Sequence, residues 1–189
     1  MKIFSKLYDL TLGWAKHKYA ERWLFGVSFA ESSFFVIPPD VMLAPMVLAR
    51  PDRAWRLAFL TTVASVLGGV LGYLIGLYAM DAIMPYVQQY GYADKLAVVQ
   101  TWFDQWGLWA LLIAGFSPVP YKLFTIASGA MGLALLPFIL VSLLGRGARF
   151  FLVAALVKAA GPKFEPVLKR YVDALGWLIV LLVVVYAFI

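Results

Sequence analysis

The chain has 189 residues, of which 63% are hydrophobic and 14% are charged, with a net charge of +6 and a mean hydropathy of +0.86. Soluble domains are roughly 45–50% apolar and about 25% charged, so the composition excludes a soluble globular protein and indicates an integral membrane protein. The sequence contains no cysteine, which excludes disulfides, thiolate metal sites and thiol catalysis.

Residues 1–22 are predicted to form an N-terminal interfacial amphipathic helix. Apolar side chains such as Phe4, Leu7 and Trp14 recur at three- and four-residue spacing, and lysines lie elsewhere on the helical wheel. This pattern is typical of a helix on the bilayer surface, and a helix packed on the rest of the protein would show it equally. The only histidine, His17, lies among these lysines and is expected at the surface.

Residues 23–49 are apolar but contain the adjacent prolines Pro38 and Pro39. Proline lacks a backbone donor and restricts the residue before it, so the helix is predicted to break there. The pieces on either side, 23–36 and 41–49, are too short to cross about 30 Å of hydrocarbon. The segment therefore predicts a re-entrant hairpin, whose non-helical backbone must be shielded by protein or line a wet cavity.

Residues 57–80 contain no charge and would form a helix about 36 Å long, which predicts a membrane span. Gly68, Gly72 and Gly76 recur every four residues within it. A stripe of small residues lets another helix approach closely. The pattern leaves open whether that helix belongs to the same chain or to a second copy in a homo-oligomer.

Residues 81–106 are more polar and are expected outside the membrane, with aromatic side chains at the interface. The next apolar stretch, 107–131, is interrupted by Pro118 and Pro120. By the reasoning used for the first proline pair, it predicts a second re-entrant hairpin.

A second span is predicted from about residue 133, followed by a basic loop near 158–170. The final apolar stretch, 174–189, predicts a C-terminal transmembrane helix. The expected organisation is therefore a membrane core over 23–160, followed by a loop and a spanning helix over 161–189.

The placement of lysine and arginine predicts the orientation. Five of them lie in residues 1–22, three in 50–56 and four in 158–170, against one in 81–106. The positive-inside rule then places the N-terminus in the cytoplasm. This is consistent only if the first hairpin returns to the side it entered from. The predicted fold class is an all-α integral membrane protein with about three spanning helices and two opposed re-entrant hairpins.

Five ionisable residues lie within hydrophobic sequence: Glu31, Asp40, Lys122, Arg146 and Arg149. Each costs about 2.5–3.5 kcal/mol at a helix centre on insertion scales, so they must pair, reach the interface or line water. We expect Glu31, Asp40 and Lys122 to meet in a wet cavity between the hairpins. Three alternatives stay open: the arginines reach the cytoplasmic interface, the acids form purely structural ion pairs, or Lys122 caps a broken helix.

The chain resembles the DedA family, in particular its YqaA-like branch, over about residues 20–160. This family shares its fold with the VTT, or SNARE-associated, proteins. The residues that carry the resemblance are Glu31, Pro38-Pro39-Asp40, Gly68, Gly72-Tyr73, Gly76, the run Gly115-Phe116-Ser117-Pro118-Val119-Pro120-Tyr121-Lys122, and Gly145-Arg146 followed by Arg149.

The resemblance implies two opposed hairpins and the movement of lipids, including undecaprenyl phosphate, across the bacterial inner membrane, driven or gated by protons. It implies proton coupling at Glu31 and Asp40. The implied substrate-binding residues are Lys122, Arg146, Arg149, Ser117 and Tyr121, and the implied structural turn residues are Pro38, Pro39, Pro118 and Pro120. Phe116 stands where the family has its first turn arginine, and Arg146 or Arg149 would supply that charge.

The predicted function is a lipid flippase or scramblase, whose partners are phosphate-headgroup lipids and protons, with no nucleic acid. The alternatives are a proton-coupled transporter of small solutes or ions and a non-transport membrane scaffold. We expect no enzyme, because one surface histidine cannot serve histidine-based phosphatase chemistry and no paired aspartate motif is present. No metal and no cofactor is expected, and the sequence has no P-loop for ATP.

Overall fold

A computed structural model describes residues 13–15, 17–33, 38–89, 93–117 and 120–188, and it gives no side-chain detail for 80–83, 86–87, 93–96 and 162–188. All regular structure in these described residues is helical, which confirms the predicted all-α class. In chain order the elements are α2 (Ala20–Ser33), α3 (Asp40–Ala49), the 3-10 helix η1 (Pro51–Arg53), α4 (Ala54–Gln89), α5 (Ala93–Trp106), α6 (Leu108–Phe116), α7 (Tyr121–Ala130) and α8 (Leu135–Phe188).

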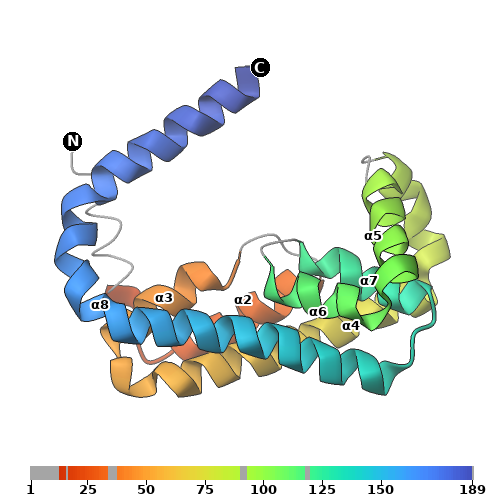
Figure 1. Cartoon of the computed structure of the whole chain (residues 1–189), viewed down its shortest axis with the longest axis horizontal. Helices are drawn as coiled ribbons and strands as arrows, with labels where there is room; N and C mark the ends of the chain where they lie inside the picture. The colour runs from red at the N-terminus through yellow and green to blue at the C-terminus, as the bar shows by residue number, and fades with distance from the viewer. Residues whose placement is uncertain (1–12, 16, 34–37, 90–92, 118–119, 189) are drawn as a thin grey trace.

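Within the described part of the chain, two stretches of helix are long and apolar enough to cross a membrane. They are Pro51–Ala79, with 29 residues and a mean hydropathy of 1.9, and Leu135–Gly161, with 27 residues and a mean hydropathy of 1.8. These stretches belong to α4 and α8, which pack against each other along the length of the molecule (Figure 1). The third expected span, 174–189, falls where side chains are not described.

Four shorter helices form two interrupted pairs, which are α2 with α3 and α6 with α7. Helix α2 ends at Ser33 and α3 begins at Asp40, after Pro38 and Pro39; this interruption is called the first break. Helix α6 ends at Phe116 and α7 begins at Tyr121, after Ser117, which is extended with φ −74° and ψ 163°, and Pro120; this interruption is called the second break. Both breaks contain predicted prolines. Figure 1 shows α2 and α3 in one half of the molecule and α6 and α7 in the other.

The glycine stripe of α4 receives helices of the same chain. A Cβ atom at Gly68 would collide with the backbone oxygen of Phe29 in α2, and one at Gly76 would collide with the backbone oxygen of Ile126 in α7. Ser33 of α2 also donates a hydrogen bond of 3.0 Å to the Gly68 oxygen. The predicted close approach is therefore confirmed and is internal, because α2 and α7 occupy the stripe.

The sequence predicts a loop near 158–170, and this prediction is wrong because these residues are helical within α8. The segment contains Pro162 and Pro166, and proline can bend a helix without ending it. Figure 1 accordingly shows α8 changing direction before its C-terminal arm. Residues 81–106 are also helical, divided between the end of α4 and α5.

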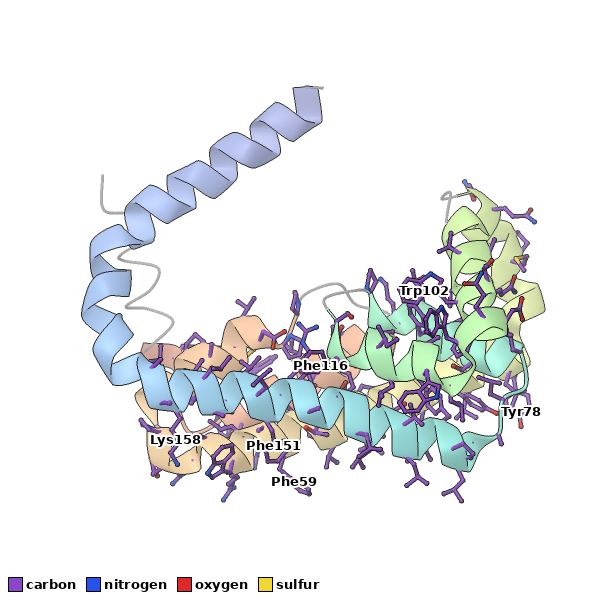
Figure 2. All side chains as sticks on the ribbon, in the orientation of Figure 1. Phe59, Tyr78, Trp102, Phe116, Phe151 and Lys158 are labelled. Carbon is purple, nitrogen blue, oxygen red and sulfur yellow. The ribbon has the colours of Figure 1, made fainter. Side chains whose placement is uncertain are left out.

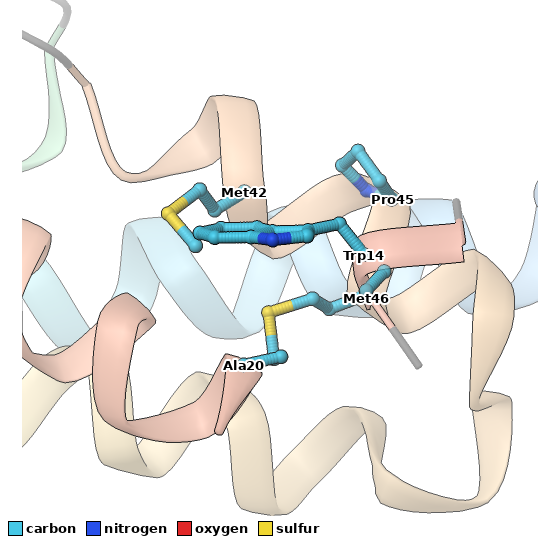
Figure 3. A pocket seen from close by; sticks show the side chains of 6 residues that line it. Trp14, Ala20, Met42, Pro45 and Met46 are labelled. Carbon is cyan, nitrogen blue, oxygen red and sulfur yellow. The ribbon is translucent and has the colours of Figure 1, made fainter. Parts of the chain in front are cut away.

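The beginning of the described chain packs on α3. Figure 3 shows the indole of Trp14 between the side chains of Met42 and Met46, which lie one turn apart. The cavity beside them, also lined by Ala15, Ala20 and Pro45, measures about 20 Å³, which is on the scale of a single water molecule. Most of the predicted interfacial helix, 1–22, lies outside the described residues.

Candidate functional site

The acids and arginines within the hydrophobic sequence form two ion pairs. The Nη2 atom of Arg146 lies 2.5 Å from Oε2 of Glu31, and the Nη2 atom of Arg149 lies 2.5 Å from Oδ2 of Asp40. The arginines are three residues apart on α8, so they share a face. Glu31 precedes the first break and Asp40 begins the helix after it. The break thus allows two acids nine residues apart to face the same helix.

The Glu31–Arg146 pair is enclosed. The Arg146 side chain is only 2% exposed, and its guanidinium lies 4.8 Å from the ring centroid of Tyr121 and 4.7 Å from that of Phe150. Arg146 therefore does not reach the interface, and for this residue the alternative of an interfacial arginine is wrong. Burial of an ion pair is tolerated when the remaining donors and acceptors also have partners.

Two serine hydroxyls complete this enclosed pair. The Nε atom of Arg146 donates to Oγ of Ser65 at 2.6 Å, and the Ser65 and Ser32 hydroxyls lie 2.7 Å apart. Ser32 in turn donates to Glu31 at 3.0 Å. Sequence reasoning missed both serines. Ser65 lies one turn before Gly68, on the face of α4 that packs against α2. A hydroxyl on this buried face is the sequence feature from which Ser65 could have been identified.

The Asp40–Arg149 pair is more open and joins the two breaks. The side chains are 24% and 19% exposed, respectively. The Nη1 atom of Arg149 donates at 2.5 Å to the backbone oxygen of Ser117, which begins the second break. The Oδ1 atom of Asp40 is buried and has no hydrogen-bond partner among the described residues. Arg149 therefore contacts one acid from the first break and one carbonyl from the second.

Lys122 does not pair with the acids. It lies partly buried in the first turn of α7, and its ammonium makes no ion pair with the described residues. The expected meeting of Glu31, Asp40 and Lys122 is therefore not observed. The arginines of α8 take both carboxylates instead.

The other predicted site residues line the second break. Tyr121 is fully buried and donates a 2.6 Å hydrogen bond to Ser142 of α8. Phe116, 49% exposed, lies near the middle of the molecule (Figure 2). Because Arg149 bonds to the next residue, Ser117, it brings a positive charge to the turn beside Phe116. Pro120 ends the second break, and Pro118 lies outside the described residues.

The charges do not balance. With every group ionised, two carboxylates and three cations are present, and Lys122 is the cation without an acid among the described residues. Removing one partner of a buried pair is costly because it leaves an uncompensated charge. No cluster of three metal-ligating side chains occurs in the described part of the chain.

Comparison with known proteins identifies the family of this chain. The VTT domain family matches residues 37–159, a range that includes Asp40, the second break and both arginines. The chain belongs to the VTT-domain family. The resemblance to DedA proteins is thereby confirmed, and the two apolar helices and the composition identify a membrane protein of this family.

Several bacterial proteins have sequences similar to that of this chain. An uncharacterized protein of Haemophilus influenzae is 48% identical over 189 residues, covering 100% of this chain and 98% of its own. An uncharacterized protein of Histophilus somni is 47% identical, covering 98% and 97%. Undecaprenyl phosphate transporter A of Staphylococcus aureus is 25% identical over 131 residues, covering 65% and 64%. No solved structure matches the chain significantly.

Proposed function

We propose that this protein is a lipid translocase, a flippase or scramblase for lipids with an anionic phosphate headgroup, such as a polyprenyl phosphate or a phospholipid. The similarity to a protein named undecaprenyl phosphate transporter A supports the lipid class, and membership in the VTT-domain family supports a membrane role. The proposed location is the bacterial inner membrane with the N-terminus in the cytoplasm.

The single observation that carries the proposal is the Arg149–Asp40 pair at the junction of the two breaks. Carboxylate and phosphate both match the planar donor fork of arginine. A phosphate headgroup can therefore take the place of Asp40 on Arg149. Lys122, at the other side of the second break, adds a point charge that is paired with no acid among the residues whose placement is described.

Proton uptake fits the same exchange. When a phosphate displaces the carboxylate of Asp40, that carboxylate loses its counter-ion in a site where one of its oxygens already has no partner. An ionised carboxylate without a partner is costly in an apolar environment. Protonation of Asp40 would remove this cost. Glu31 is the second proposed proton acceptor, reached through Ser32 and Ser65.

The interrupted pairs α2–α3 and α6–α7 are proposed to be re-entrant hairpins that enter from opposite faces of the bilayer. Each helix in these pairs has 9 to 14 residues, which is shorter than the about 20 residues that a span requires. Their breaks leave backbone groups without helical partners, such as the Ser117 oxygen. Such backbone is tolerated at membrane depth where protein or water covers it, and Arg149 covers this one.

Two other functions use the same residues. A proton-coupled transporter of small solutes or ions would use Glu31 and Asp40 without a lipid headgroup. A non-transport scaffold would use the pairs structurally, and the closed network around Arg146 favours that role for one pair. The more open Asp40–Arg149 pair, with its unpartnered oxygen, favours transport.

The test is flipping of labelled lipids by the purified protein in liposomes, with a phosphatidylglycerol probe and a phosphatidylcholine probe at two pH values. We expect the anionic probe to flip several-fold faster than the zwitterionic probe. A solute-uptake arm with the same liposomes separates the alternatives. Solute movement without lipid flipping would support the solute transporter, and neither movement would support the scaffold.

A further inference from the structure

A second charged region lies outside the proposed transport site, in a groove between the first turns of α2 and α4. The groove has a volume of about 390 Å³ and is lined by Glu21, Arg22, Phe25, Arg56 and Leu60. On α2, Phe25 lies one turn after Glu21 and Arg22. On α4, Leu60 lies one turn after Arg56. Each helix therefore contributes one face, with polar residues at one end and apolar residues at the other.

The polar end of the groove is positively charged despite its acid. Glu21 is only 17% exposed, because it pairs with Arg53 at 3.3 Å and Arg56 at 2.8 Å. The Arg56 side chain is 68% exposed, and a guanidinium has five N–H donors, so most of its donors remain free for another partner. Arg22, also exposed, contributes a further charge. The groove thus presents cations while its carboxylate is covered.

The apolar end of the groove points to a lipid. Phe25 is 36% exposed. Leu60 lies one helical turn after Arg56, further into the apolar stretch that begins at Pro51. Trp23 and Trp55 each adjoin one of the groove's arginines in sequence and are 57% and 47% exposed, and exposed tryptophans mark the membrane–water interface. A headgroup at the arginines would therefore place its acyl chains beside Phe25 and Leu60.

We propose that this groove binds one anionic phospholipid from the surrounding bilayer, with its phosphate on Arg22 and Arg56 and an acyl chain along Phe25 and Leu60. This site is separate from the Arg149 site and goes beyond the proposed transport function. Charge complementarity selects an anionic headgroup, and the apolar lining selects a lipid over a soluble phosphate compound. The bound lipid fixes the depth of α2 and α4 at the interface.

The test is native mass spectrometry of the purified full chain with added phosphatidylglycerol or phosphatidylcholine of the same acyl chains. It is done in the Arg149→Ala background, so that lipid at the transport site contributes less to the signal. A charge near an anionic membrane surface contributes about fivefold in affinity. We therefore expect the further double substitution Arg22→Ala and Arg56→Ala to weaken phosphatidylglycerol binding roughly thirtyfold, with phosphatidylcholine binding unchanged.

Lys158→Ala is the matched control, because Lys158 lies 5.2 Å from the ring centroid of Trp55 on the α8 side of α4. Figure 2 shows it at the end of the molecule that also carries Phe59. This control should bind phosphatidylglycerol as well as its parent. Arg22→Lys with Arg56→Lys keeps both charges and should lose only a few-fold.

Three results would overturn the proposal. The first is equal retention of the two lipids, and the second is an equal loss in the Lys158→Ala control. The third is displacement of phosphatidylglycerol by soluble glycerol phosphate, which would assign the groove to a soluble ligand. Thermal unfolding of each variant verifies that it is folded, which is expected because both arginines are exposed. Failure of lipid flipping in liposomes would leave this binding result unaffected.

Discussion

The substitution Arg146→Ala is expected to destabilise the protein by about 3–5 kcal/mol, the cost of removing one partner of a buried ion pair. Glu31 would keep its charge with only the Ser32 hydroxyl as a partner. Tyr121 and Phe150 would lose the guanidinium packed on their rings. The measurement is equilibrium unfolding in detergent followed by tryptophan fluorescence, for which the chain has seven tryptophans.

Two controls separate a buried-pair effect from a general loss of charge. Arg53→Ala removes a largely exposed partner of Glu21 and should cost less than about 1 kcal/mol. The double substitution Glu31→Leu with Arg146→Met removes both charges together and should recover most of the lost stability. If Arg146→Ala were as stable as Arg53→Ala, the enclosed network would not support the fold as described.

The substitution Arg149→Ala is expected to slow the flipping of an anionic lipid roughly ten- to hundredfold, which corresponds to about 1.5–3 kcal/mol for a hydrogen bond to a charged group. The reason is that the phosphate headgroup replaces the Asp40 carboxylate as the partner of Arg149. Its effect on stability should be smaller than that of Arg146→Ala, because the pair is partly exposed. The measurement is the rate at which a labelled phosphatidylglycerol becomes accessible to an external quencher in liposomes.

Arg149→Lys and Lys158→Ala complete this experiment. Lysine keeps the charge but lacks the planar fork, so Arg149→Lys should flip lipid at an intermediate rate. Lys158 lies outside the proposed transport site, and its substitution should leave the rate unchanged. A rate for Arg149→Ala equal to that of Lys158→Ala would show that Arg149 is not part of the transport path.

Much of the fold could be predicted from local chemistry. Adjacent prolines such as Pro38 and Pro39 interrupt a helix whatever the helix packs against. The break predicted there and the one predicted at Pro118 and Pro120 are both present. The glycine spacing of α4 likewise specified a close helix contact, which α2 and α7 provide. Prolines 162 and 166 show the limit of this reasoning, because proline bends some helices without ending them. Local sequence does not decide which outcome occurs.

The sequence singled out the four residues that form the two ion pairs, but not which cation pairs with which acid. The insertion cost alone identifies five charges in apolar sequence that must pair, reach the interface or line water. Which cation takes which acid depends on how α8 lies against the first break, and that is set by packing across the whole chain. The three-residue spacing of Arg146 and Arg149 suits the two acids, and this spacing was the signal for the arginine pairing. Ser32 and Ser65 carry no charge and gave no comparable signal.

The most direct test of the exchange at Arg149 is the affinity of the purified protein for a short-chain phosphatidylglycerol, compared between wild type, Asp40→Asn and Arg149→Ala. The account predicts opposite effects. Asp40→Asn should bind the lipid more tightly, because the competing carboxylate is gone, and Arg149→Ala should bind it at least about tenfold more weakly. Equal weakening in both variants, or no change in either, would contradict the claim that headgroup and carboxylate compete for this arginine.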